Sequence, residues 1–349
     1  MKFNQVTIKD IARELGISPS TVSRALKDHP DISTETKKAV NELAIKLNYQ
    51  PNIVALSLRQ KKTNTIGIII PEIVHFFFST VISGIDDVAK QAGYNVILAQ
   101  SNESYQREVS DIKVLFNSRV DGMLISVSRE TSNFDHIESI ISRGMPVVFY
   151  DRNYNSPNVS KVIVDDYNGA KEAVNHLIEQ GCKRIAHIEG APGLSISTDR
   201  LSGYMDALKE NKIKIDEGLI QKCPSGSMED AKQTTKKLLA LPSPPDGVFA
   251  NTDMMAMGAI MAIKEKGLKV PQDVAVVGFS NWSFSELTEP SLSSVDQPGY
   301  EMGQEAARLL IRQIEVKDKD VAEYTPETKI LKTKLIIRNS SQRKAEKKK

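Results

Sequence analysis

The chain has 349 residues, enough for two or three domains, and its 40% hydrophobic and 26% charged residues are typical of a globular protein. The net charge of +2 is unevenly distributed: residues 1–62 carry eleven Lys or Arg against six Asp or Glu, and residues 63–342 carry thirty against thirty-seven. No apolar run is long enough to span a bilayer, and the first residues lack the apolar segment of a signal peptide, so we expect neither membrane contact nor secretion.

A basic amino-terminal module on an acidic body suggests that one end of the chain contacts a polyanion. Lysine-rich helical domains without such a partner are also common, so charge alone leaves the question open. The two cysteines, Cys182 and Cys223, show no CxxC spacing, which indicates free thiols in a reducing compartment. We therefore expect a cytoplasmic protein.

Two short helices are predicted at the start of the chain. Thr7 precedes an apolar stripe at helical spacing, with Asp10 three residues later in a capping-box position, and Gly16 ends this helix. Ser18 caps the second helix, over 19–26, and Pro19 stands at its first position, where a missing N–H costs nothing.

A third predicted helix runs from Ser33 to about Leu47 and completes the core of a helix-turn-helix module. The second helix leaves short hydroxyls and one guanidinium on or near its outer face. These side chains suit the major groove of double-stranded DNA, where Arg can bond both acceptors of guanine and small residues let the helix sit deep. The alternative is a small helical domain with a solvated polar face. The outer residues are Ser20, Thr21, Ser23 and Arg24.

A very short amphipathic segment follows, over 52–59. Asn52 can cap a two-turn helix there, which would be marginal alone in water and would form only against a partner. Leu56 and Leu58 have no local core, which fits apolar wedges inserted into a DNA minor groove. The alternative is a frayed linker.

This module resembles the headpiece and hinge helix of the lactose/galactose repressor (LacI/GalR) family. The family pattern T-[IL]-x-D-[VI]-A-x-x-x-G-[VI]-S-x-x-T-V-S-R is met from Thr7 to Arg24, and L-x-Y-x-P-N-x-x-A-x-x-L is met from Leu47 to Leu58. The resemblance implies base contacts from Pro19, Ser20 and Arg24, backbone contacts from Thr21, Ser23 and Tyr49, and a wedge at Leu58. The residues expected to bind DNA are Thr7, Ser18, Pro19, Ser20, Thr21, Ser23, Arg24, Tyr49, Asn52, Ala55 and Leu58.

The rest of the chain alternates strands and helices. Continuous apolar runs of four or five residues predict buried parallel strands, and helical patterns follow them, so we expect two successive doubly wound α/β units. The predicted strands are 66–70, 95–99, 122–125, 147–150, 184–188, 247–250 and 274–278. The predicted helices are 77–92, 105–117, 133–143, 167–180, 199–210, 228–240 and 254–266.

Residues 65–340 resemble the two-lobed, periplasmic-binding-protein-like body of the same family, whose chain crosses between lobes three times. The crossings are expected near Val162, Ser293 and Thr325. The expected layout is an all-α headpiece over 1–50, a hinge helix and linker over 51–62, an α/β body over 63–340 and a disordered basic tail over 341–349. Lobe 1 would comprise about 63–161 and 293–325, and lobe 2 about 162–292 and 326–340.

Ligand candidates follow the predicted strand ends, where such sheets bind small molecules. Aromatic, amide, carboxylate and guanidinium groups together suit a polyhydroxylated, sugar-like effector. Any one of them can instead be a helix cap, as Asp253 at the start of a helix illustrates. The family resemblance implies that Arg200 grips the ligand. The candidates are His75, Phe76, Phe77, Asn102, Ser126, Asp151, Arg200, Asn251, Asp253, Ser280 and Asn281.

One position departs from the family pattern. The family often has Gly-[FY]-Asp-[ND] after the last strand, and this chain has Gly278-Phe279-Ser280-Asn281, so the carboxylate that usually holds sugar hydroxyls is replaced and a plain hexose is put in doubt.

No enzyme motif is present in the sequence. It lacks GxGxxG, Walker and GxSxG patterns, and its five histidines show no metal-ligand spacing, so we expect neither catalysis nor a cofactor or metal. The tail lacks an apolar heptad repeat, so a homodimer is expected. The leading interpretation is a transcriptional regulator, expected to be a repressor, that binds a near-palindromic operator and responds to an effector. The alternatives are a solute-binding transport component, which shares the body, and an α/β enzyme.

Overall fold

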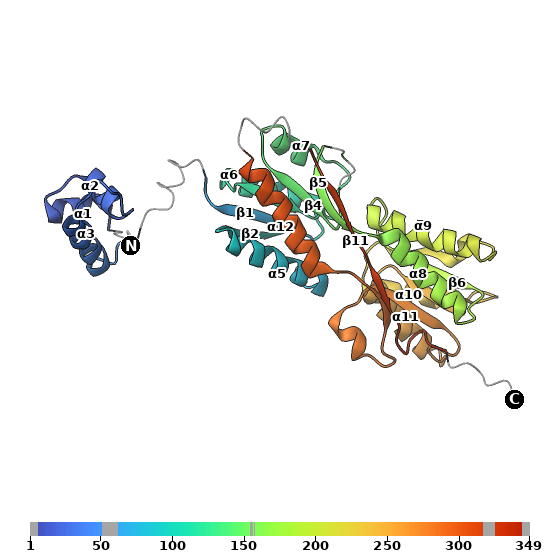
Figure 1. The fold of residues 1–349 in the computed structure, drawn as a ribbon. Coiled ribbons are helices and arrows are strands. Elements are labelled where there is room, and N and C mark those ends of the chain that lie inside the picture. Colours follow the sequence, from blue (N-terminus) through green and yellow to red (C-terminus); the bar gives the residue numbers. More distant parts are fainter. Residues whose placement is uncertain (1–5, 51–61, 154–155, 157, 317–324, 344–349) are drawn as a thin grey trace. The chain divides into compact units, whose positions relative to one another are not determined.

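The computed structural model describes residues 6–50, 62–153, 156, 158–316 and 325–343. The chain divides into two compact units, Met1–Asn64 and Thr65–Lys349 (Figure 1). The first unit holds helices α1 (Ile8–Leu15), α2 (Pro19–Ala25) and α3 (Thr34–Lys46), as predicted. The predicted hinge helix over 52–59, with Asn52, Ala55 and Leu58, lies outside the described residues.

Local side-chain bonds fix the ends of the first two helices. The Asp10 carboxylate accepts from the Thr7 backbone N–H at 3.0 Å and from its hydroxyl at 2.7 Å. Gly16 ends α1 with φ +64°, a conformation that glycine adopts without strain. The Ser18 hydroxyl accepts from the backbone N–H of Thr21 at 3.0 Å. These predicted caps are confirmed, and they orient α2 for the core that all three helices share.

The second unit contains two six-stranded sheets, one in each lobe (Figure 1). The first has the order β11-β5-β4-β3-β1-β2, formed by Thr328–Leu331, Ser160–Val164, Val147–Tyr150, Gly122–Ile125, Thr65–Ile70 and Asn95–Gln100. The second has the order β12-β10-β9-β8-β6-β7, formed by Lys334–Ile336, Ser293–Asp296, Ala275–Ser280, Gly247–Ala250, Ile185–Glu189 and Ile220–Lys222. Within these sheets only β12 pairs antiparallel, with β10. Two parallel lobes are therefore confirmed.

Helices cover both faces of each sheet. They are α5 (Phe76–Gln91), α6 (Tyr105–Asn117), α7 (Asp135–Ile141), α8 (Asp166–Glu179), α9 (Ser195–Glu210), α10 (Met228–Leu239), α11 (Asp253–Glu265) and α12 (Gly299–Glu315). Helix α12 was not predicted, and it packs closely on α5. A methyl group at Gly84 or Gly303 would overlap a backbone carbonyl of the other helix, so these glycines permit the close approach.

The chain crosses between the lobes three times within the described residues, but not where the sequence placed the crossings. The first follows β5, which still belongs to the first sheet, and so lies after Val164 rather than near Val162. The second follows β10, so it lies after Asp296 rather than near Ser293. The third falls between β11 and β12, after Leu331 rather than near Thr325. The predicted positions are therefore two, three and six residues too early, because short, partly polar strands adjoin each crossing.

The carboxyl-terminal stretch is ordered further than predicted. Ser340 and Ser341 are fully buried, and Arg343 donates from Nε to the Pro271 carbonyl at 2.9 Å. A disordered tail beginning at 341 is therefore wrong for 341–343. In the described part of the chain, no helix is long and apolar enough to cross a membrane.

Candidate functional site

The outer face of α2 carries the predicted DNA-reading side chains. Pro19, Ser20 and Arg24 are exposed, whereas Val22 and Ala25 on the opposite face are buried in the three-helix core. Thr21, Ser23 and Tyr49 are half-buried, and Thr7 and Ser18 stand exposed at the helix caps. A short helix with its apolar face anchored thus offers a guanidinium and small residues to a groove.

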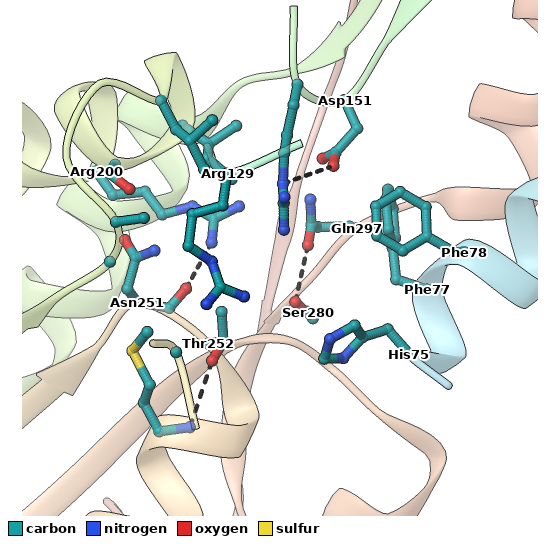
Figure 2. A pocket seen from close by; sticks show the side chains of 18 of the residues that line it. His75, Phe77, Phe78, Arg129, Asp151, Arg200, Asn251, Thr252, Ser280 and Gln297 are labelled. Atoms are coloured by element: carbon teal, nitrogen blue, oxygen red, sulfur yellow. Dashed lines mark hydrogen bonds and ion pairs between the residues drawn. The ribbon is translucent and has the colours of Figure 1, made fainter. Parts of the chain in front are cut away.

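In the second unit a cavity lies between the lobes, near the carboxyl ends of the strands (Figure 2). The first lobe contributes aromatic side chains and two arginines, and the second contributes polar groups from the ends of β6, β8 and β9. The cavity volume is about 90 Å³. Its lining includes His75, Phe77, Phe78, Arg129, Asp151, Arg152, Ser197, Arg200, Asn251, Ser280, Trp282 and Gln297.

Three neutral polar atoms on residues that line the cavity are buried and have no hydrogen-bond partner within the described protein. They are the side-chain oxygen of Asn251, the hydroxyl oxygen of Ser197 and the amide nitrogen of Gln297. The other end of the Gln297 amide accepts from the Ser280 hydroxyl at 2.9 Å (Figure 2). An unmade bond at a buried polar group is costly, so a ligand that supplies partners here would be bound favourably.

Arg200, on α9 of the second lobe, lines the cavity and is only 2% exposed. Its Nε donates to the Asp166 carboxylate at 2.7 Å, its Nη1 donates to the Asn251 backbone carbonyl, and its guanidinium stacks 3.6 Å from the centre of the Phe279 ring. Burial raises the pKa of Asp166 to about 6, against the opposing effect of Arg200. Arg200 therefore ties α8, α9 and the end of β8 together at the cavity wall.

The two arginines of the first lobe share one carboxylate. Nη1 of Arg152 lies 2.7 Å from one oxygen of Glu103 and 2.9 Å from the other, and Nη2 of Arg129 lies 3.2 Å from Glu103. Burial alone would raise the pKa of Glu103, but these guanidinium groups outweigh it and lower that pKa. Burial also raises the pKa of Asp151, with Arg152 opposing.

Six of the eleven predicted effector residues line the cavity: His75, Phe77, Asp151, Arg200, Asn251 and Ser280. The structure does not bring the other five to its wall. Asn102 and Phe76 are exposed, and Ser126 is fully buried. Asp253 accepts hydrogen bonds from Trp282, Ser285 and Ser294, and Asn281 bonds Asp296 and Arg338, so both support loops instead.

Several lining residues were not predicted, chiefly Phe78, Arg129, Ser197 and Gln297. Phe78 follows two predicted aromatic candidates directly, which was an available signal. Ser197 lies in the first turn of α9, and the predicted helix began two residues later. Gln297 follows a strand that was not predicted, and Arg129 follows the third predicted strand at a distance of four residues.

A helix-turn-helix unit followed by a two-lobed α/β unit with a cavity between its lobes defines a DNA-binding regulator that senses a small molecule. The model described as "Bacterial regulatory proteins, lacI family" matches residues 7–52, and "Periplasmic binding proteins and sugar binding domain of LacI family" matches residues 63–338. The chain belongs to the LacI family, and it is a transcriptional regulator rather than an enzyme.

Among its relatives is the ribose operon repressor of Halalkalibacterium halodurans, 34% identical over 335 residues that cover 96% of this chain and 97% of the relative. The lac repressor dimer bound to operator and an anti-inducer superposes with a TM-score of 0.84 at 25% identity, covering 97% of this chain and 99% of that one. A LacI family regulator from Enterococcus faecium with bound ribose gives a TM-score of 0.68 at 29% identity, covering 79% of this chain and 98% of that one.

Proposed function

We propose that the body binds a small, uncharged sugar-like effector in the inter-lobe cavity, and that this binding sets the operator affinity of a homodimer. The observation that carries the proposal is a set of three buried, neutral polar atoms without partners on residues that line the cavity, namely Ser197, Asn251 and Gln297. Sugar hydroxyls can donate and accept, so one ring can satisfy an amide oxygen, a hydroxyl and an amide N–H together.

The charges around the cavity favour a neutral ligand. Arg200 is paired with Asp166, and Arg129 and Arg152 are paired with Glu103, so each guanidinium at the wall has a carboxylate partner. A phosphate or carboxylate on the ligand would have to compete for these buried pairs. The related ribose operon repressor and the related regulator with bound ribose also point to a neutral sugar.

The roles of individual residues follow from these contacts. Asn251, Gln297 and Asp151 would bond ligand hydroxyls, and Phe77 would pack on a ring face. Arg200 would position Asn251 while offering its remaining N–H groups to the ligand. On the headpiece, Pro19, Ser20 and Arg24 would face base edges while Thr21, Ser23 and Tyr49 contact the DNA backbone.

Operator and effector would act on each other reciprocally. Two copies of the headpiece would occupy the two halves of a near-palindromic operator, on the nucleoid in the cytoplasm. A ligand that binds one lobe arrangement better than another shifts the population toward that arrangement. Residues 51–62, which connect the units, would transmit the shift, and whatever change the effector makes in operator affinity, the operator makes in effector affinity.

Calorimetric titration of the full-length protein with ribose, other neutral monosaccharides, sugar phosphates and uronates tests the ligand class. We expect a neutral sugar to bind, and substitution N251A or Q297A to weaken it about tenfold, since each leaves a ligand group unpaired. The exposed amide substitution N117A is the matched control and should bind as the parent does. Tight binding confined to anionic sugars, or undiminished binding by both cavity variants, would overturn the proposal.

A further inference from the structure

An arginine of the first lobe reaches the second lobe directly. Arg129, in the loop after β3, donates from Nη1 to the backbone carbonyl of Ser225, in the loop between β7 and α10. Its Nη2 lies 3.2 Å from Oε1 of Glu103, which follows β2 in the first lobe. Figure 2 shows the Arg129 side chain extending across the pocket rather than along its wall.

Arg129 follows β3 in the middle of its sheet, but its two partners, Glu103 after β2 and Ser225 after β7, lie at the edge of the cleft away from the crossings. β2 and β7 are the outermost strands of their sheets, at the ends opposite β11 and β12. The three crossings between the lobes follow β5, β10 and β11, which lie at the other ends. When two lobes rotate about their crossing segments, the distance between them grows most at the edge farthest from those segments. A contact near that edge is therefore stretched more by opening than a contact near the crossings.

The carboxylate side of the contact is held rigidly. Glu103 has φ +59° and follows Asn102 at φ +50°, two successive residues in the left-handed region that turn the carboxylate toward the arginines. Glu103 also accepts from the Arg129 backbone N–H at 2.7 Å and pairs with Arg152. The orientation of the Arg129 guanidinium is therefore set by contacts within the first lobe.

The carbonyl side is held as well. Gly226, with φ +66°, turns the chain after Ser225, and its N–H donates to the Cys223 carbonyl at 3.0 Å. The Ser225 hydroxyl donates to Asp230 at 2.8 Å. The acceptor is thus a fixed backbone group at the amino end of α10, and its position reports directly on the position of the second lobe.

We propose that Glu103, Arg129 and the Ser225 carbonyl form a latch that holds the lobes together over the effector pocket. Arg129 is then a positioning residue, which sets the fraction of protein with closed lobes before any ligand arrives. The effect of the latch on ligand affinity rests on the proposed inter-lobe effector site. The latch itself does not, because all of its bonds join groups of the body to one another.

Distance measurements between spin labels on the two lobes test the latch without an effector. Labels are attached through substitutions K113C on α6 and K237C on α10, both exposed, while the native Cys182 and Cys223 are buried. In the full-length, ligand-free protein, R129M should broaden the distance distribution and shift it to longer distances. E103Q, which weakens the ion pair at constant size, should do so to a smaller degree.

The matched control is N153A, which removes a different inter-lobe hydrogen bond, 3.2 Å from the Asn153 amide to the Ser195 hydroxyl, after β4 and nearer the crossings. It should change the distribution less than R129M. A ligand-free distribution identical in the parent, R129M and E103Q would overturn the latch, even if R129M weakened effector binding, because Arg129 would then be only a ligand contact. Failure of every sugar to bind, with the shift in distances observed, would refute the proposed effector and leave the latch standing.

Discussion

A buried histidine in the second lobe makes the stability of that lobe sensitive to acid. His187 lies on β6, fully buried, with its ring stacked 5.2 Å from Tyr204 and 5.0 Å from Phe249. Its Nδ1 is 3.1 Å from the Phe249 carbonyl oxygen. Burial is the largest effect and lowers the pKa of His187 from 6.5 to about 4.

The sign and size of the effect follow from proton linkage. Between pH 6.5 and 4 the unfolded chain binds a proton at this position and the folded chain does not, so stability falls as the pH falls through that window. With the two pKa values of 6.5 and about 4, the loss between pH 7.5 and pH 5 is about 2 kcal/mol. Asp166 works in the opposite direction, because burial raises its pKa and its protonation then stabilises the folded state as the pH falls from about 6.

The difference between the parent and a variant isolates His187 from such opposing groups. Urea unfolding followed by the fluorescence of Trp282, the chain's single tryptophan, reports on the second lobe. The H187Q variant will be less stable throughout because it loses the ring stacking. Between pH 7.5 and pH 5, however, the parent should lose about 2 kcal/mol more than the variant.

The same substitution at His29, which belongs to the first unit, is the control and should leave the pH profile of this transition unchanged. Parallel profiles for the parent and H187Q would refute the reasoning, since they would mean that His187 takes up its proton equally in the folded and unfolded chains.

Three further predictions concern DNA reading and packing. R24A should weaken specific operator binding by about 1–3 kcal/mol and relax preference at one base pair, which a selection from randomised operators would detect; unchanged preference would exclude Arg24 from base reading. L58A should weaken specific binding in a gel-shift titration while circular dichroism stays unchanged, and full operator affinity would defeat the wedge hypothesis. G303A should destabilise the first lobe by about 1–3 kcal/mol in urea, because its methyl group would overlap the Val81 carbonyl; a neutral result would mean that α5 and α12 separate easily.

Elements specified by local chemistry were predicted almost to the residue. The start of α2 is fixed by Ser18 and Pro19, and the predicted range 19–26 compares with Pro19–Ala25 in the structure. Strands with continuous apolar runs were also found, because burial on both faces demands such runs. β10 was missed because its sequence, Ser293-Ser-Val-Asp296, buries two serines where the other strands bury apolar side chains. Ser293 bonds Ser340 and Ser341 of the carboxyl-terminal segment, and the Ser294 hydroxyl donates to Asp253 on α11.

α12 was missed for a different reason. Its first turns contain Gly299 and Gly303, which lower helix propensity and obscure an otherwise amphipathic pattern. Their value lies in letting α12 approach α5, and that benefit exists only once both helices are in place. Helix propensity is a local quantity, whereas this packing joins segments more than two hundred residues apart. The local sequence pattern therefore did not indicate a helix here.

The same distinction between local and long-range determinants applies to the residues of the candidate site. Residues directly after a predicted strand, such as Asp151 and Asn251, could be placed at the cavity from strand order alone. Arg129 could not, because its direction depends on a carboxylate elsewhere in the chain. The fully buried Glu108 on α6 accepts from the Ser128 backbone N–H at 2.6 Å and from the Thr131 hydroxyl at 2.9 Å, and so fixes both sides of the loop that carries Arg129. The sequence pattern alone suggests that Glu108 is a solvent-exposed position of α6. In the folded lobe Glu108 is buried and holds the loop from which Arg129 crosses the cleft.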